Sequence, residues 1–144
     1  MEFINDLALD LVAGLAYGVV GIALMLIGYK VIDLLTPGDL GDLLVTHRRR
    51  DAGLIVGAST LGIGLIVSVA ILTSEGDLTR GLAESAGFGA IGIALMGAAF
   101  VAIDRVTPGS LGQIVSDEHE DPALAYVIAA FLLAVAGIIA AAIS

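Results

Sequence analysis

Four long apolar runs, separated by short polar segments, dominate the chain. They cover residues 11–29, 52–73, 81–103 and 123–143. Each is close to the ~20 residues that an α-helix needs to cross ~30 Å of hydrocarbon at ~1.5 Å per residue. The pattern therefore predicts an all-α integral membrane protein with four transmembrane helices.

The first and third runs end in the same phrase. Residues 32–41 read IDLLTPGDLG, and residues 103–112 read IDRVTPGSLG. At an offset of 71 residues, twelve of the 21 positions from Gly21 to Gly41 are identical to their counterparts. Each repeat unit, 1–73 and 74–144, holds two spans, so both units enter the membrane in the same direction. We expect one membrane domain built from two parallel two-helix repeats.

Most of the phrase predicts a corner in the chain. Proline cannot continue a helix and moves the residue before it out of the helical region, so a helix should end at or before each threonine. Threonine followed by proline also favours a new helix start, with threonine as N-cap. The leucines that follow predict a short amphipathic helix at the membrane interface. The candidate corner residues are Thr36, Pro37, Gly38, Thr107, Pro108 and Gly109.

The aspartates of the phrase need a separate explanation. Asp33 and Asp104 fall in the last turn of their helices, where the helix dipole disfavours negative charge. Lys30 lies three positions before Asp33 on the same face, and Arg105 follows Asp104 directly. One interpretation is that each carboxylate holds the corner by bonding to the turn or to a neighbouring basic side chain. The other is a pair of acidic groups at the mouth of a pathway, since ionisable residues in spans are functional candidates.

Small residues recur at helical spacing in the spans. Small-xxx-small spacing lets helix backbones approach closely and drives association where lipid supplies no hydrophobic force. The pattern predicts packing within the four-helix unit or against neighbouring protomers, with a glycine-lined conduit as the alternative. The candidate packing residues are Gly14, Gly18, Gly53, Gly57, Gly92 and Gly97.

The distribution of basic residues predicts the orientation. The first loop carries His47 followed by three arginines, whereas the residues before the first span contain no Lys or Arg. Short loops rich in Lys and Arg stay on the cytoplasmic side. We therefore expect the two Thr-Pro-Gly loops in the cytoplasm and both termini outside a cell (inner) membrane.

Composition excludes several function classes. The chain is 58% hydrophobic with a mean hydropathy of +1.04, it carries a net charge of −9, and it has no cysteine. The absence of cysteine rules out disulfides and thiolate metal sites, and the negative charge argues against nucleic acid as a partner. The acidic stretch at 117–121 is either a solvated loop or a set of oxygen ligands for a divalent cation. We expect no cofactor.

The repeated phrase also carries a family resemblance. The Gly-Ile-Ala-Leu segment, the aromatic residue at Tyr29 or Phe100, and the Ile-Asp-x-x-Thr-Pro-Gly motif resemble those of the YjfL-type bacterial and archaeal membrane proteins, which form domain-of-unknown-function family 350. The resemblance covers nearly the whole chain. It implies four spans, an inner-membrane location and an association with the cell envelope, and it brings no catalytic residues.

Two functions follow as expectations. The first is an oligomeric, envelope-associated scaffold or accessory component that contacts the lipid bilayer, other copies of itself and a cytoplasmic protein. The alternative is a cation channel or transporter with Asp33 and Asp104 near its cytoplasmic mouth. No nucleophile and base occur at a catalytic spacing, so we do not expect an enzyme.

Overall fold

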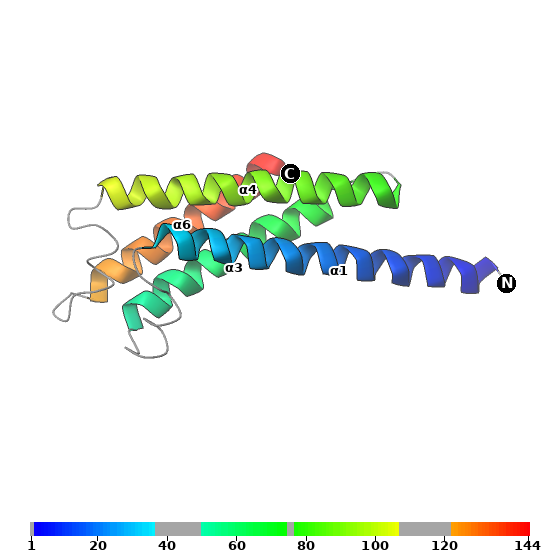
Figure 1. Ribbon diagram of the computed structural model, residues 1–144, viewed down its shortest axis with the longest axis horizontal. Helices are drawn as coiled ribbons and strands as arrows, with labels where there is room; N and C mark the ends of the chain where they lie inside the picture. Colours follow the sequence, from blue (N-terminus) through cyan, green and yellow to red (C-terminus); the bar gives the residue numbers. More distant parts are fainter. Residues whose placement is uncertain (1, 37–49, 75–76, 107–121) are drawn as a thin grey trace.

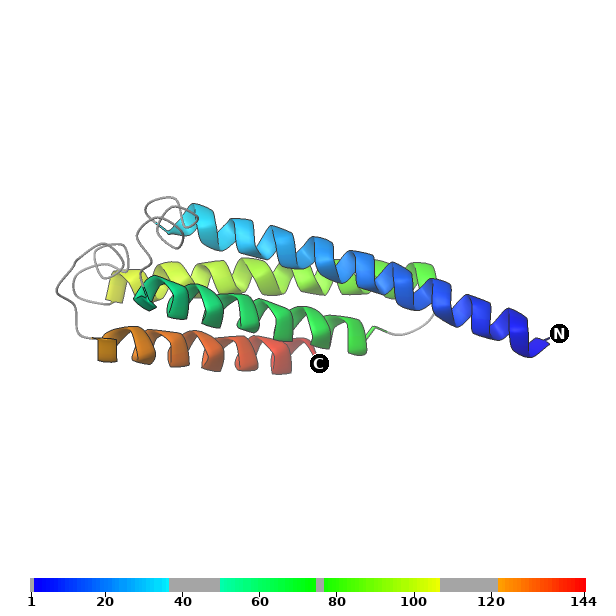
Figure 2. The ribbon, with the colours of Figure 1, turned by 90° about the horizontal axis from the view of Figure 1, so that it is seen from below.

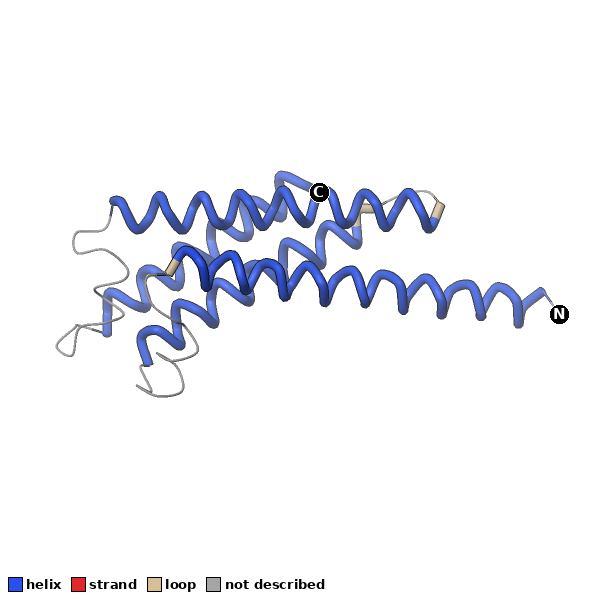
Figure 3. Tube along the Cα trace, in the orientation of Figure 1, coloured by secondary structure: helices blue, strands red, loops and turns tan. Residues whose placement is uncertain are grey.

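The apolar runs fold into four helices. The structure, a computed structural model, describes residues 2–36, 50–74, 77–106 and 122–144. Its helices are α1 (Glu2–Leu35), α3 (Arg50–Leu72), α4 (Leu78–Val106) and α6 (Pro122–Ile143), and the described residues between them form only short turns (Figure 3). All four helices are long and apolar enough to cross a membrane. The predicted all-α fold with four spans is confirmed.

α1 and α4 extend at both ends beyond the apolar runs that predicted them. α1 has 34 residues, which corresponds to about 51 Å at 1.5 Å per residue. It includes Asp6 and Asp10, because isolated charged residues do not break a helix in the way that proline does. α4 begins at Leu78, before the apolar run that starts at residue 81. Its first turns carry an ion pair between Arg80 and Glu84, whose Nε and Oε1 atoms lie 2.8 Å apart.

The C-terminal end of α1 lies where the Thr-Pro sequence predicts it. The carbonyl oxygen of Ile32 accepts hydrogen bonds from the Thr36 backbone N–H, at 3.0 Å, and from the Thr36 hydroxyl, at 2.9 Å. The helix ends at Leu35, so the predicted end at or before Thr36 is confirmed. The two expected interfacial helices fall on residues 37–49 and 107–121, outside the described residues.

The helices run up and down in a four-helix bundle. α1 and α4 run in one direction, and α3 and α6 run in the other (Figure 1). α1 packs against α3 and α4, and α6 packs against the same two helices. α1 and α6 therefore lie at the two outer edges, with α3 and α4 between them (Figure 2). Whether the hairpins α1–α3 and α4–α6 are copies of one structural unit stays a prediction.

The core lies where α3, α4 and α6 meet. Its most deeply buried large side chains include Ile63, Ile66, Met96 and Leu132. Two glycines allow close approach there. A Cβ atom at Gly92 would collide with Ile66, and one at Gly62 would lie 2.8 Å from the Cβ of Ala136. Small residues thus bring these helix backbones together, as helix packing in lipid requires.

Candidate functional site

The candidate corner residues gather at one end of the bundle. α1 and α4 end on the same side, where α3 and α6 begin (Figure 1). Asp33 and Asp104 occupy the last turns of α1 and α4, so both lie at this end and both are half-buried. The remaining corner residues Pro37, Gly38, Thr107, Pro108 and Gly109 lie outside the described residues.

Asp33 has a basic neighbour on its own helix. The Nζ atom of Lys30 lies 2.9 Å from Oδ2 of Asp33, as the spacing of three residues allows. The Asp33 side chain is 19% exposed and that of Lys30 is 71% exposed. The positive charge offsets the unfavourable interaction of the carboxylate with the C-terminal end of the helix dipole.

This exposed ion pair should contribute little to stability. We expect Lys30→Gln to lower the free energy of unfolding by less than about 1 kcal/mol, the usual range for pairs open to solvent. Unfolding by SDS in mixed micelles, followed by circular dichroism, measures the change. A loss of more than about 2 kcal/mol would instead show that Lys30 supports the corner as a whole.

Arg105 lies beside a groove rather than within the core. Its side chain is exposed at the end of α4. It lines a groove of about 430 Å³ between α1 and α4, together with Val31, Leu35 and Gly97. The groove has an apolar floor, with the positively charged side chain of Arg105 at its edge.

The candidate packing glycines divide into two groups. Gly92 and Gly97 pack inside the bundle, where a Cβ at Gly97 would lie 3.2 Å from side-chain atoms of Leu35 and of Val31. Gly14, Gly18 and Gly57 are exposed, and no described atom of another helix lies within 4 Å of the Cβ position at any of them. Gly53 is half-buried near the start of α3. The first group joins helices within the chain, and the second does not.

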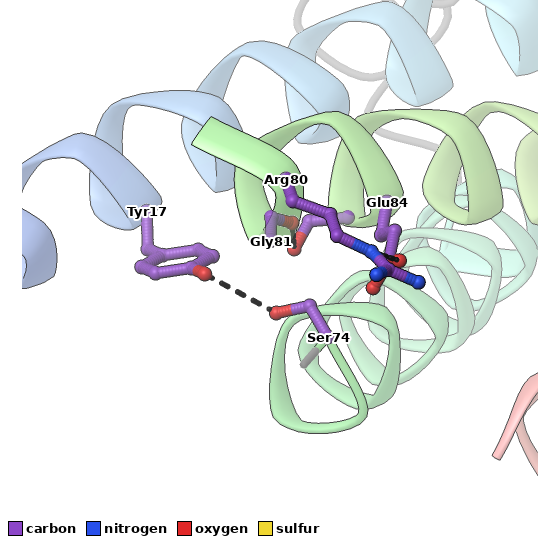
Figure 4. A network of polar contacts seen from close by, with 6 residues as sticks. Tyr17, Ser74, Arg80, Gly81 and Glu84 are labelled. Atoms are coloured by element: carbon purple, nitrogen blue, oxygen red, sulfur yellow. Dashed lines mark hydrogen bonds and ion pairs between the residues drawn. The ribbon is translucent and has the colours of Figure 1, made fainter. Parts of the chain in front are cut away.

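A junction at the opposite end was not predicted. The hydroxyl oxygens of Tyr17 on α1 and Ser74 after α3 lie 3.4 Å apart, and Tyr17 reaches over Gly81 in the first turns of α4 (Figure 4). A Cβ at Gly81 would collide with the tyrosine hydroxyl. These residues are far apart in the sequence, and no spacing rule connects them. The only sequence signal for this contact is Gly81, the one glycine in the first two turns of α4.

The second groove lies on the outer side of α4 and α6. It has a volume of about 360 Å³ and is almost entirely apolar. Its walls include Ala102 and Val106 from α4 and Val127 and Phe131 from α6. A surface of this kind suits an apolar helix or a lipid chain better than a polar ligand.

Acidic and histidine side chains do not form a metal site in the part of the chain that the structure describes. No group of three or more His, Asp or Glu residues comes together there. The acidic stretch at 117–121 lies outside that part, so its proposed cation binding stays a prediction.

Comparison with known proteins places the chain in a family. It matches the family described as Domain of Unknown Function (DUF350) over residues 6–143. A UPF0719 transmembrane protein of Mycolicibacterium paratuberculosis is 36% identical over 141 residues, covering 98% of this chain and 93% of the relative. A UPF0719 transmembrane protein of Mycobacterium bovis is 36% identical over 133 residues, covering 92% and 87%. No solved structure matches the chain. With four helices suited to spanning a membrane and a family match over nearly its whole length, the chain belongs to the DUF350 family of membrane proteins.

Proposed function

We propose that this protein is a non-catalytic, oligomeric scaffold or accessory component of the cell's inner membrane. The observation that carries the proposal is the open glycine pair on α1. Gly14 and Gly18 face away from the bundle, with no other described helix within 4 Å of either Cβ position. Glycine gains little from facing lipid and lowers helix propensity. Its spacing of four residues instead suits close contact with another helix.

The exposure of α1 supports the same proposal. Only 17% of the most apolar window of its span is buried, against 50% for α3. Most of the surface of α1 is therefore not covered by the other three helices, although one face of its C-terminal half packs against α3 and α4, and its N-terminal part projects beyond them (Figure 2). A second protomer can reach this surface without disturbing the core.

We further propose that the Thr-Pro-Gly corners face the cytoplasm and recruit a cytoplasmic protein. The basic residues of the first loop favour that side. The last of them, Arg50, is exposed at the start of α3. The envelope association rests on the family resemblance of the repeated phrase.

The scaffold is favoured over a cation channel. A channel mouth would need both aspartates to face a pathway, yet Asp33 lies 2.9 Å from Lys30 on the same helix. That contact accounts for one of the two carboxylates by local structure. The remaining argument for a channel is only that the residues lie at the end of the bundle.

Measurement of the particle mass tests the proposal. We expect the purified protein in a mild detergent or in lipid nanodiscs to form an oligomer by native mass spectrometry. Gly14→Leu combined with Gly18→Leu should dissociate it while helix content stays unchanged, because neither position packs within the chain.

Gly87→Leu is the matched control, since this glycine on α4 is equally open and faces away from the other helices. Its oligomer should remain intact. A monomeric native protein, or equal dissociation by all of these leucines, would refute the scaffold.

A further inference from the structure

The two hairpins differ in which of their faces are buried. At the offset of 71 residues, Leu24 corresponds to Leu95, and Leu61 corresponds to Leu132. Leu24 is 6% exposed and Leu95 is 47% exposed, whereas Leu61 is 69% exposed and Leu132 is fully buried. Hairpins related by a closed two-fold axis would bury matching positions on both copies. Here one face of the first hairpin packs against a different face of the second.

This contact between hairpins has two distinct sides. On α1, Leu24 lies against Gly89 of α4, where its Cδ1 would be 2.6 Å from an added Cβ, and Val31 and Leu35 lie against Gly97. α1 thus contributes large side chains, and α4 contributes glycines. The two sides fit each other but are not alike.

The residues that correspond to each side of this contact in the other hairpin are exposed. The counterparts of Leu24, Val31 and Leu35 are Leu95, Ala102 and Val106, and all three are exposed on α4. On α1, the counterparts of Gly89 and Gly97 are Gly18 and Leu26, which are exposed as well. The outer side of α4 therefore repeats two of the three large side chains, at Leu95 and Val106, and the outer side of α1 repeats, at Gly18, the glycine that lies against Leu24 within the chain.

The apolar groove between α4 and α6 marks the same place. Two of the residues that line it, Ala102 and Val106, correspond to Val31 and Leu35. In the first hairpin, those counterparts contact α4 at Gly97. The groove on the second hairpin therefore corresponds to the surface of the first hairpin against which α4 packs.

We propose that a second copy of this chain continues the packing, with its α1 lying along the outer groove of α4 and α6 and its Gly18 against Leu95. The contact is head to tail, because one copy presents its outer α4 face and the other its outer α1 face. It covers the part of α1 from Gly18 toward its C-terminal end. The correspondence with the α1–α4 contact inside the chain ends before Asp10, because this charged residue stands where Gly81 stands on α4.

Comparison of counterpart residues on α3 and α6 also indicates that a row of copies joined in this way curves. Within the chain, α3 and α6 meet closely at Gly62 and Ala136. Their counterparts, Leu133 and Leu65, are larger, so α6 and the α3 of the next copy lie further apart. The contact through Gly18 stays close, which makes each copy wedge-shaped. In the proposed assembly this rotation returns to the first copy, so the head-to-tail contacts close into a ring and do not extend as an open filament.

Cysteine cross-linking tests this geometry, which rests on the proposed oligomeric function. The chain has no native cysteine, so introduced thiols have no background. Differently tagged Gly18→Cys and Leu95→Cys chains are co-expressed, and the membranes are treated with a mild oxidant or a short bis-thiol reagent. We expect dimers that carry one tag of each kind, and either variant alone should stay uncrosslinked. The double variant should give a ladder of bands that ends at the closed ring.

The matching pair within the chain is the control. Leu24→Cys with Gly89→Cys should form a bond inside one chain, with no increase in mass, and this verifies both folding and reactivity. If this bond forms and the native particle is oligomeric, but Gly18→Cys and Leu95→Cys do not cross-link, the head-to-tail geometry is wrong while the scaffold survives. Strong self-cross-linking of Gly18→Cys alone also overturns it, since that indicates a two-fold contact. A monomeric particle mass overturns both proposals.

Discussion

Replacing Gly92 with leucine should lower the free energy of unfolding by about 3 kcal/mol, at the upper end of the usual cost of overpacking. Gly92 lies where α4 meets both α3 and α6. An added Cβ would collide with Ile66 and lie 3.6 Å from Ile139, and both of these side chains are buried. Neither neighbour can move without displacing the core, so the helices must separate. SDS unfolding in mixed micelles, read by circular dichroism, measures the loss.

Gly87→Leu on the same helix is the control for this prediction. No described atom of another helix lies within 4 Å of its Cβ position. We expect its free energy of unfolding to stay within about 0.5 kcal/mol of the native value, as at other exposed positions. Equal losses at the two glycines would show that leucine acts through the helix itself and not through the collision with Ile66.

The elements of the fold could be predicted because they depend on local properties of the sequence. Run length sets the number of spans, and Thr36 followed by proline sets the end of α1. The Lys30–Asp33 contact likewise follows from a spacing of three residues on one helix. Each of these features involves neighbours along the chain, so no knowledge of the tertiary structure is needed.

Burial could not be predicted in the same way. In a soluble helix, the apolar stripe marks the core, but a membrane helix is apolar on all sides. Gly18 and Gly92 look alike in the sequence, yet Gly92 packs against two helices and Gly18 against none that the structure describes. The Tyr17–Ser74 contact joins residues 57 positions apart. Such features depend on which helix faces which, and only the tertiary structure determines that.

The repeat itself provides the sharpest test of this difference. Leu61 and Leu132 are the same residue type and are paired by the 71-residue offset of the predicted repeat. Leu132 is fully buried in the core beside Gly62, while Leu61 is 69% exposed. Leu132→Ala should therefore lower the free energy of unfolding by about 2–5 kcal/mol, through lost contacts and the cavity that remains.

Leu61→Ala should cost far less when the protein is held monomeric in detergent, because most of its side chain there faces the surrounding hydrocarbon. In a lipid environment that preserves the oligomer, its cost should rise, since the proposed assembly places this face of α3 against α6 of the neighbouring copy. Unfolding of both variants in both environments measures the two effects. Equal losses in the monomer would mean that the hairpins bury matching faces, which would remove the basis of the head-to-tail arrangement.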